Sequence, residues 1–542
     1  MVGIMDMGNM HIEKSTKKMV FFKAPIRRYQ LITISIVFYN APCVAIDWSI
    51  TPNLQVQEIF SDNIKLSSKN QSSAFVTSVS PGVSVIGRSA RNMLNLNYNM
   101  QNLYNANGDN NISIFNQLNF NSQHTLLSER FFLNTSSSIS QQNISNTQIA
   151  NDNISGNGNR TNVSTVQLSP YWTPHFGSFA DGMFRIDFNT ITSSANSANT
   201  FVNNNNQQSN AFSDTVTLGE TIQLNSGNDF KRVAWNAALQ NTKNYRDGGQ
   251  DVTFRNYHGT VRTFINTDFN LFATAGMSDN NFQTVTDSNK NGFYYTVGGQ
   301  WKPSNNYSIE VGGGNNSHVT VYISPMQRLN WTTTYRNNSI GLNTGSTWQT
   351  NLNYQAKNST WYVSHTNDTV TTQSIFANQK YLTGNTSGNT SSGGDSSSGN
   401  IFGPNGSTTY FPNQTDDVYV RKTWNLGVTY MTGKSTIGGN AFNEKRTSQL
   451  FGNTETVQGV TASWNWQFAP KTSAYIYPVW QQIDRDTTIA KDNRYDVTLG
   501  MSRLITNSLT GKLEFRHLNQ SSDIETNNYQ ENRATASLFM RF

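Results

Sequence analysis

Bulky apolar and small polar side chains alternate along the chain from about residue 46 to its last residue. The clearest stretch is 460–468, where Val460, Ala462, Trp464, Trp466 and Phe468 alternate with Thr461, Ser463, Asn465 and Gln467. The same alternation recurs in 94–101, 183–188, 424–430 and 512–516. A period of two residues is typical of β-strands with two unlike faces. We find no convincing helical stretch after residue 46, so the pattern predicts an all-β protein.

The connectors between the predicted strands alternate between short and long. Short ones fall near 88–90, 126–128, 226–230, 266–267, 302–305, 325–326, 356–358, 432–434, 469–470 and 506–507. Long ones fall near 61–73, 105–111, 144–161, 195–213, 279–291, 373–416, 447–455, 485–493 and 521–528. The segment 173–181 is a longer member of the short set, and 246–250 is a shorter member of the long set. A transmembrane β-barrel carries short periplasmic turns at one end and longer extracellular loops at the other. The alternation therefore predicts one antiparallel, up-and-down transmembrane barrel of about 24 strands, with 20 or 22 left open because 306–313 and 318–324 are weak.

The polar faces of these strands carry amides and hydroxyls more than Lys and Glu, and Tyr and Trp recur near strand ends. This pattern indicates apolar side chains facing lipid, polar ones facing a wet lumen, and an aromatic girdle at each interface. A lipid-facing Lys or Arg near mid-membrane costs about 2–4 kcal/mol, which favours the lumen for the charged residues. The candidate lumen-lining residues are Asn95, Asn97, Asn99, Arg185, Asp187, Arg336, Thr429, Asn465, Gln467, Lys512, Glu514, Arg516 and Arg533.

The composition narrows the class of protein. The chain is 35% hydrophobic, 13% charged and 12% aromatic, with one cysteine in 542 residues. Long disordered chains are poorer in aromatic residues, and a mean hydropathy of −0.55 is too polar for several membrane-spanning helices. A disulfide scaffold needs more than one cysteine, and an ordinary cytosolic enzyme carries roughly 25% charged residues. A polar-lined barrel fits all four observations.

Residues 1–45 read as a signal peptide. Six basic residues precede an apolar core from Leu31 to Phe38, and the segment ends in Cys43-Val44-Ala45. A charged start, a short apolar core and small residues at the end are typical of secretory leaders. The six basic residues against two acidic ones account for +4 of the total +6, leaving about +2 for residues 46–542. We therefore expect no nucleic-acid binding, because no basic patch remains.

The end of the chain carries a second targeting signal. Leu538, Met540 and Phe542 lie on one apolar face of the last predicted strand, and Phe542 is the last residue. A terminal strand that ends in phenylalanine resembles the signal read by the outer-membrane barrel assembly machinery. Together, the two signals predict the outer membrane of a Gram-negative bacterium as the location. A secreted soluble β-repeat protein is the alternative, although no repeat of 20–50 residues is visible.

A family resemblance lies between Trp48 and Arg91. The stretch reads Trp48-Ser49-Ile50-Thr51-Pro52, continues with 56–64, and ends with Phe75–Gly87 and Arg91. It resembles the outer-membrane barrel family associated with PEP-CTERM/exosortase systems and exopolysaccharide gene clusters. The resemblance implies a barrel linked to polysaccharide or surface-protein export. It also implies exopolysaccharide or its periplasmic export proteins as partners, beside outer-membrane lipid and the assembly machinery, and it carries over no catalytic residues.

Candidate catalytic chemistry is sparse. The seven histidines have no metal-ligand spacing, and we read His318 and His365 as solvated or lumen-facing. Gly433-Lys434-Ser435 reads as a hairpin turn rather than a phosphate loop, because its context is strand, turn and strand. Asp416-Asp417 reads as a solvated loop end, with a catalytic acidic pair or a calcium contact as weaker alternatives. We expect no enzyme activity, no cofactor and no metal site.

Two functions follow from a barrel of this size. The first is a porin-like channel for passive passage or export of neutral or weakly charged solutes or polysaccharide. Its lumen would lack an N-terminal plug domain, because the first strand begins at the expected cleavage site. The second is a non-conducting scaffold or adhesin whose long loops bind surface polysaccharide or partner proteins. The Gly-, Ser- and Asn-rich segment 381–416 is a flexible loop that covers the outside or folds into the lumen as a constriction.

The outward apolar face predicts the solvent requirement of the purified protein. Residues 46–542 should stay monodisperse only in detergent or lipid, because the apolar faces of the strands would otherwise associate in water. Size-exclusion chromatography with and without detergent measures this. A monodisperse detergent-free peak would contradict the barrel orientation.

Overall fold

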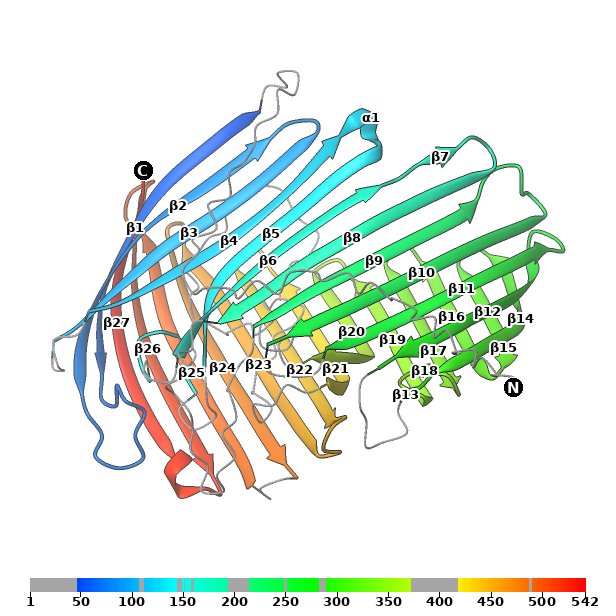
Figure 1. The fold of residues 1–542 in the computed structure, drawn as a ribbon. Coiled ribbons are helices and arrows are strands. Elements are labelled where there is room, and N and C mark those ends of the chain that lie inside the picture. The colour runs from blue at the N-terminus through cyan, green and yellow to red at the C-terminus, as the bar shows by residue number, and fades with distance from the viewer. Residues whose placement is uncertain are drawn as a thin grey trace, which may run out of the picture. The chain divides into compact units, whose positions relative to one another are not determined.

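The computed structural model describes residues 46–106, 112–143, 149–150, 152–156, 160–193, 214–247, 251–281, 289–371, 418–486 and 490–542. Residues 46–542 form one compact unit, and the predicted signal peptide 1–45 lies outside the described residues. The unit is an antiparallel barrel in which each long strand pairs with its neighbours in chain order. The first strand also pairs with the last, Asn53–Ser61 against Arg541–Arg533, which closes the barrel (Figure 1).

Long strands account for 24 of the 27 strands in the described residues, because β7, β13 and β18 have two residues each. The long strands are β1 (Asp47–Ser61), β2 (Ala74–Arg88), β3 (Asn92–Asn105), β4 (Ile112–Leu126), β5 (Phe131–Asn143), β6 (Arg160–Trp172), β8 (Ala180–Ser193), β9 (Thr215–Ser226), β10 (Val233–Arg246), β11 (Val252–Phe264), β12 (Phe269–Asn280), β14 (Gly292–Ser304), β15 (Tyr307–Gly314), β16 (Asn316–Met326), β17 (Leu329–Asn338), β19 (Gly345–Gln355), β20 (Ser359–Thr371), β21 (Val418–Met431), β22 (Ser435–Ser448), β23 (Thr454–Ala469), β24 (Thr472–Arg485), β25 (Ala490–Leu504), β26 (Leu509–Ser522) and β27 (Tyr529–Arg541).

The predicted fold class and strand number are confirmed. The two weakest predicted strands are β15 and β16, which are joined by Asn315 alone. The remaining elements are short: β7 (His175–Phe176) pairs with β8, and β13 (Asn289–Lys290) pairs with β18 (Gly341–Leu342). In the described residues the helices are single turns, α1 (Leu127–Arg130) and the 3-10 turn η2 (Glu525–Asn527). No helix in this part of the chain is long and apolar enough to cross a membrane.

The two barrel ends differ in their connectors. We call the end with turns such as 432–434 the short-turn end, and the end with connectors such as 62–73 the long-loop end. At the short-turn end, Gly433-Lys434-Ser435 lies in the β21–β22 hairpin, where the Thr432 amide donates to the Ser435 carbonyl at 2.7 Å. The hairpin interpretation of this motif is therefore confirmed.

Alternation along each strand separates an apolar outer face from a polar inner one. On β25, Tyr495, Leu499 and Met501 point outward and are 42–49% exposed, whereas Arg494 and Asp496 point inward and are buried. Such an apolar exterior reverses the arrangement of a soluble protein and matches a belt that meets lipid. Lipid offers the backbone no hydrogen-bond partners, so only a closed sheet satisfies every strand.

Three tyrosines on the inner face bridge three consecutive strands each. They are Tyr294, Tyr362 and Tyr475, which lie directly opposite Gly276, Gly427 and Gly500 in the neighbouring strands. Each ring crosses its glycine and donates a hydrogen bond to the next strand, to Asn256 at 2.9 Å, Asn440 at 2.8 Å and Glu514 at 2.8 Å respectively. An aromatic ring laid over a glycine covers exposed backbone and fixes the register of the strands.

The Tyr475 bridge predicts the effect of a single methyl group. A Cβ on Gly500 would lie 2.1 Å from the Tyr475 ring, so Gly500→Ala should displace the ring and break its hydrogen bond to Glu514. We expect the free energy of unfolding to fall by about 1–3 kcal/mol, measured by urea unfolding in detergent.

Gly313→Ala provides the control, because no atom lies within 4 Å of a Cβ added there. Its effect on the unfolding midpoint should be clearly smaller. Equal losses of stability for the two substitutions would show that the Tyr475 bridge is not what Gly500 protects.

Candidate functional site

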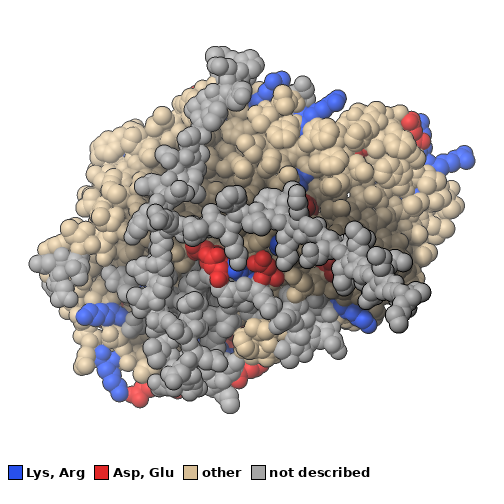
Figure 2. All heavy atoms as spheres, in the orientation of Figure 1, with Lys and Arg blue, Asp and Glu red and all other residues tan. Residues whose placement is uncertain are grey.

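Charged side chains gather on the inner face of β22–β27 toward the long-loop end. The basic members are Arg446, Arg485, Arg494, Arg516 and Arg533, and the acidic members are Glu444, Glu455, Asp492, Asp496 and Glu531. We call these ten residues the lumenal charge cluster. Nearly all are buried, and Figure 2 shows acidic and basic atoms together in the middle of the face drawn there. Buried charges of this density require partners, so their pairing defines the site.

Strand periodicity explains how the sequence builds the cluster. Charges of opposite sign occur two residues apart in Glu444/Arg446, Asp492/Arg494/Asp496 and Glu531/Arg533, so they share the inner face of one strand. Pairs between strands complete the network: Arg485 contacts Asp492 at 2.5 Å, and Arg516 contacts Asp496 at 2.6 Å. The cluster is therefore a lattice of ion pairs within and across strands.

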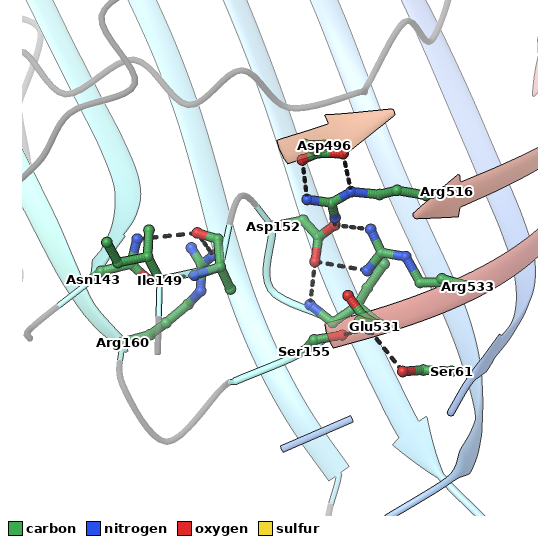
Figure 3. A network of polar contacts seen from close by, with 12 residues as sticks. Ser61, Asn143, Ile149, Asp152, Ser155, Arg160, Asp496, Arg516, Glu531 and Arg533 are labelled. Atoms are coloured by element: carbon green, nitrogen blue, oxygen red, sulfur yellow. Dashed lines mark hydrogen bonds and ion pairs between the residues drawn. The ribbon is translucent and has the colours of Figure 1, made fainter. Parts of the chain in front are cut away.

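A loop from another part of the wall enters this lattice. Its described residues are 149–150 and 152–156, between β5 and β6, and we call them the lumenal loop (Figure 3). Asp152 accepts hydrogen bonds from Arg516 Nη1 at 3.1 Å and from Arg533 Nη1 at 3.1 Å, and a further short bond from Arg533 Nη2. Its Oδ1 also accepts the Ile154 amide at 3.0 Å. All four contacts hold the carboxylate between the two guanidinium groups.

The rest of the lumenal loop is anchored by apolar and polar contacts. Ile149 packs with Phe442, Val457 and Ile483 of β22–β24, and Ala150 packs with Leu66, Leu518 and Tyr529. The Tyr529 hydroxyl donates to the Ile149 carbonyl at 2.8 Å. The hydroxyls of Ser61 and Ser155 both donate to Glu531 (Figure 3). The loop thus joins the inner faces of strands that lie at opposite ends of the sequence.

Amide side chains form the other flank of the lumenal loop. Asn153 donates to Gln101 at 2.9 Å and to Gln141 at 3.2 Å. Gln141 in turn donates to Asn162 at 3.0 Å and accepts from Gln117 at 3.3 Å. These five residues, which we call the amide ladder, lie on the lumenal loop and on β3–β6. Each amide has both donors and acceptors, and the ladder uses them to hold the lumenal loop against β3–β6.

The electrostatics of Asp152 follow from its neighbours. Burial disfavours its charged form, but the guanidinium groups of Arg533 and Arg516 outweigh that effect and hold the pKa of Asp152 well below its usual range. A depressed pKa means that the charged carboxylate stabilises the docked loop above the ordinary aspartate pKa of 3.8. This stabilising contribution is lost only as the pH falls through the depressed pKa of Asp152, so the loop stays docked at neutral pH.

A smaller charged group lies on the inner face of β11, β15 and β16. Arg262 contacts Glu310 at 2.8 Å, and His318 contacts the same carboxylate at 3.1 Å. The described residues hold no group of three His, Cys, Asp or Glu side chains that could bind a metal ion. His365 differs from expectation, because it faces outward and stacks on Trp424 with ring centroids 4.3 Å apart. The two flanking tryptophans, Trp348 and Trp424, cover the imidazole and make this outward position tolerable.

All thirteen predicted lumen-lining residues lie at inward positions of their strands. Arg516 and Arg533 belong to the lumenal charge cluster, Lys512 pairs with Glu514 at 2.6 Å, and Arg185 pairs with Asp187 at 2.7 Å. Arg336 donates to Gln349 at 2.6 Å. The others are Asn95, Asn97, Asn99, Thr429, Asn465 and Gln467. The predicted assembly residues Leu538, Met540 and Phe542 are exposed on the outer surface.

The sequence interpretation missed most of the site. Alternating signs two residues apart on β22, β25 and β27 could have revealed the acidic and basic members on those strands. The sequence did not indicate a role for Asp152, because a loop of small polar residues carries no pattern that predicts which strands it will contact. The predicted constriction 381–416 and the pair Asp416-Asp417 lie outside the described residues.

Comparison with solved structures returns an iron transporter, a siderophore receptor and an outer-membrane protein, all at very low sequence identity. The FrpB iron transporter of Neisseria meningitidis (F5-1 variant) matches with a TM-score of 0.43 and 10% identity, over 91% of this chain and 82% of that one. The siderophore receptor PirA of Acinetobacter baumannii gives 0.44 and 8%, over 91% and 80%. A loop-deletion mutant of OmpT from Vibrio cholerae gives 0.29 and 8%, over 92% and 100%. Likenesses this distant carry no inference about function.

No family model matches the chain, and no curated protein matches it by sequence. The candidate site therefore rests on its own geometry.

The contacts of Asp152 predict that its charge docks the lumenal loop. Ala150→Cys places a thiol on a residue that is 2% exposed, and the one native cysteine, Cys43, lies in the predicted signal peptide. Removing one partner of a buried ion pair costs about 3–5 kcal/mol. Asp152→Asn should therefore speed thiol labelling by a membrane-impermeant maleimide by at least about tenfold.

Asp368→Asn is the matched control for this labelling. Asp368 also receives two guanidinium hydrogen bonds, from Arg421 at 3.0 and 2.6 Å, but on β20–β21 away from the lumenal loop. It should leave the labelling rate unchanged. An unchanged rate in Asp152→Asn, or equal acceleration by both substitutions, would remove the docking role of Asp152.

Proposed function

We propose that this chain is a porin-like channel in the outer membrane of a Gram-negative bacterium. It would let small or polymeric polar solutes cross passively, without catalysis and without a cofactor. The observation that carries the proposal is the division of the wall into an apolar outer face and a polar inner face around a closed 24-strand barrel. Barrels of 16–18 strands already leave an aqueous channel.

The residue types on the inner face of the barrel favour an aqueous lumen over a packed apolar core. Amides, hydroxyls and ion pairs dominate the inward positions, and apolar clusters such as Ile149, Phe442, Val457 and Ile483 gather where the lumenal loop meets the wall.

The lumenal loop would set the size of the passage. It links β5–β6 with β22–β27, so it would narrow the space between these walls to less than the barrel circumference suggests. Because the described lumenal charges are mostly paired, they would give weak ion selectivity. The resemblance of Trp48–Arg91 to barrels of exopolysaccharide loci supports polysaccharide as one cargo, with periplasmic export proteins as partners.

Single-channel recording tests the proposal directly. The purified barrel in a planar lipid bilayer should give open steps on the nanosiemens scale, because a polar lumen of this circumference conducts ions. An equal amount of heat-unfolded protein serves as the control for detergent artefacts. Efflux of neutral dextrans of graded size from liposomes would then give the size limit.

The alternative is a non-conducting scaffold or adhesin whose long loops bind polysaccharide or proteins. A barrel that inserts correctly, shown by its resistance to protease in liposomes, but remains electrically silent would contradict the channel and favour this alternative.

A further inference from the structure

Two arginines of the lumenal charge cluster oppose each other directly. Arg516 on β26 and Arg533 on β27 are register partners, and both side chains point inward. Like charges at directly opposed positions of an antiparallel pair destabilise the sheet. Asp152 lies between the two guanidinium groups and offsets this repulsion, in addition to Asp496 on Arg516.

The groups around the pair orient it toward the lumen. Arg516 Nε and Nη2 donate to the two oxygens of Asp496 at 2.9 and 2.6 Å. This fork fixes the guanidinium plane and leaves Nη1 directed at Asp152 (Figure 3). Arg533 directs both Nη1 and Nη2 at the same carboxylate. Bidentate geometry of this kind is specific for planar carboxylates and for phosphates.

The carboxylate that contacts both arginines comes from the lumenal loop, whereas Asp496, which contacts Arg516, comes from the wall. Asp152 is the acidic residue of the described lumenal loop, and its side chain keeps 22% exposure while those of Arg516 and Arg533 keep 8% and 6%. Asp152 is therefore the least buried of the three side chains, and the arginines form the buried base of the site. A solute in the lumen could approach the site from the side on which Asp152 is exposed.

We propose that the Arg516–Arg533 pair is a binding site for the carboxylate of an acidic sugar, and that Asp152 occupies the site as an internal competitor. The proposal deepens the channel function and rests on it for its physiological meaning. A sugar is favoured because the amide ladder begins at the next residue, Asn153, and release of the lumenal loop would free the amide oxygens of Gln101 and Gln141 for hydroxyl groups. A carboxylate is the anion that both arginines are seen to hold.

Competition within the chain predicts the affinity. A binding site that is free for only a small fraction of the time shows an apparent affinity reduced by that fraction. Wild-type protein should bind weakly, and entry of the acidic sugar should release the lumenal loop from Arg516 and Arg533. The solute would thus open the constriction that it has to pass.

Calorimetry on the full barrel in detergent, at low ionic strength, tests the site with galacturonate as the probe and galactose as its neutral counterpart. We expect Asp152→Asn to bind galacturonate at least about tenfold more tightly than wild type. Asp368→Asn should bind as wild type does, and galactose should not bind measurably. Adding Arg533→Gln to Asp152→Asn should weaken galacturonate binding by at least about tenfold, which locates the site.

A second measurement tests the proposal even if the Asp152→Asn variant does not fold. With Asp152 intact, galacturonate should accelerate maleimide labelling of Ala150→Cys in a dose-dependent manner, and galactose should not. Equal galacturonate affinity in wild type and Asp152→Asn, or no acceleration of labelling, would overturn the proposal. Inorganic phosphate that binds Asp152→Asn as tightly as galacturonate would overturn the sugar assignment. None of these measurements requires ion flow, so a silent bilayer recording would remove the channel without removing the site.

Discussion

The absence of hydrogen-bond partners in lipid is the constraint on which the rest of this structure depends. Every strand must pair on both sides, and the pairing of β1 with β27 completes the ring. Closure then fixes the direction of every side chain, because successive residues must face lipid or lumen in turn. The composition follows directly: the chain needs bulky apolar residues outside and uncharged polar residues inside, and it has little use for surface lysine and glutamate.

The same alternation explains why charge could accumulate inside. Two residues that are two positions apart on a strand share one face. Strand periodicity alone therefore makes neighbours of Glu531 and Arg533, and of Glu444 and Arg446. Arg516 and Arg533 are different, because their direct opposition is unfavourable unless a carboxylate lies between them. Asp152 resolves this conflict, and the cost of leaving the two arginines without it keeps the lumenal loop in place.

How much could be predicted depended on the range of the interaction. Alternation is local, so the all-β fold, the strand number and the inward positions of residues such as Asn97 and Arg516 could be deduced from the sequence. The turn at Gly433–Ser435 could be interpreted for the same reason. The contact between Asp152 and Arg533 spans 381 positions and depends on how the barrel closes, which no local pattern contains. His365 was misjudged because the tryptophans that cover it come from neighbouring strands.

The tyrosine that crosses Gly500 has a mechanical consequence. Tyr475 ties β24 to Glu514 on β26, and Glu514 is the inward residue next to Arg516. Sliding of these three strands would break this tie, so the wall that carries the arginines resists shear. Stiffness is thus concentrated in the wall on which the described residues of the lumenal loop are docked. A rigid frame of this kind keeps Arg516 and Arg533 at a constant spacing.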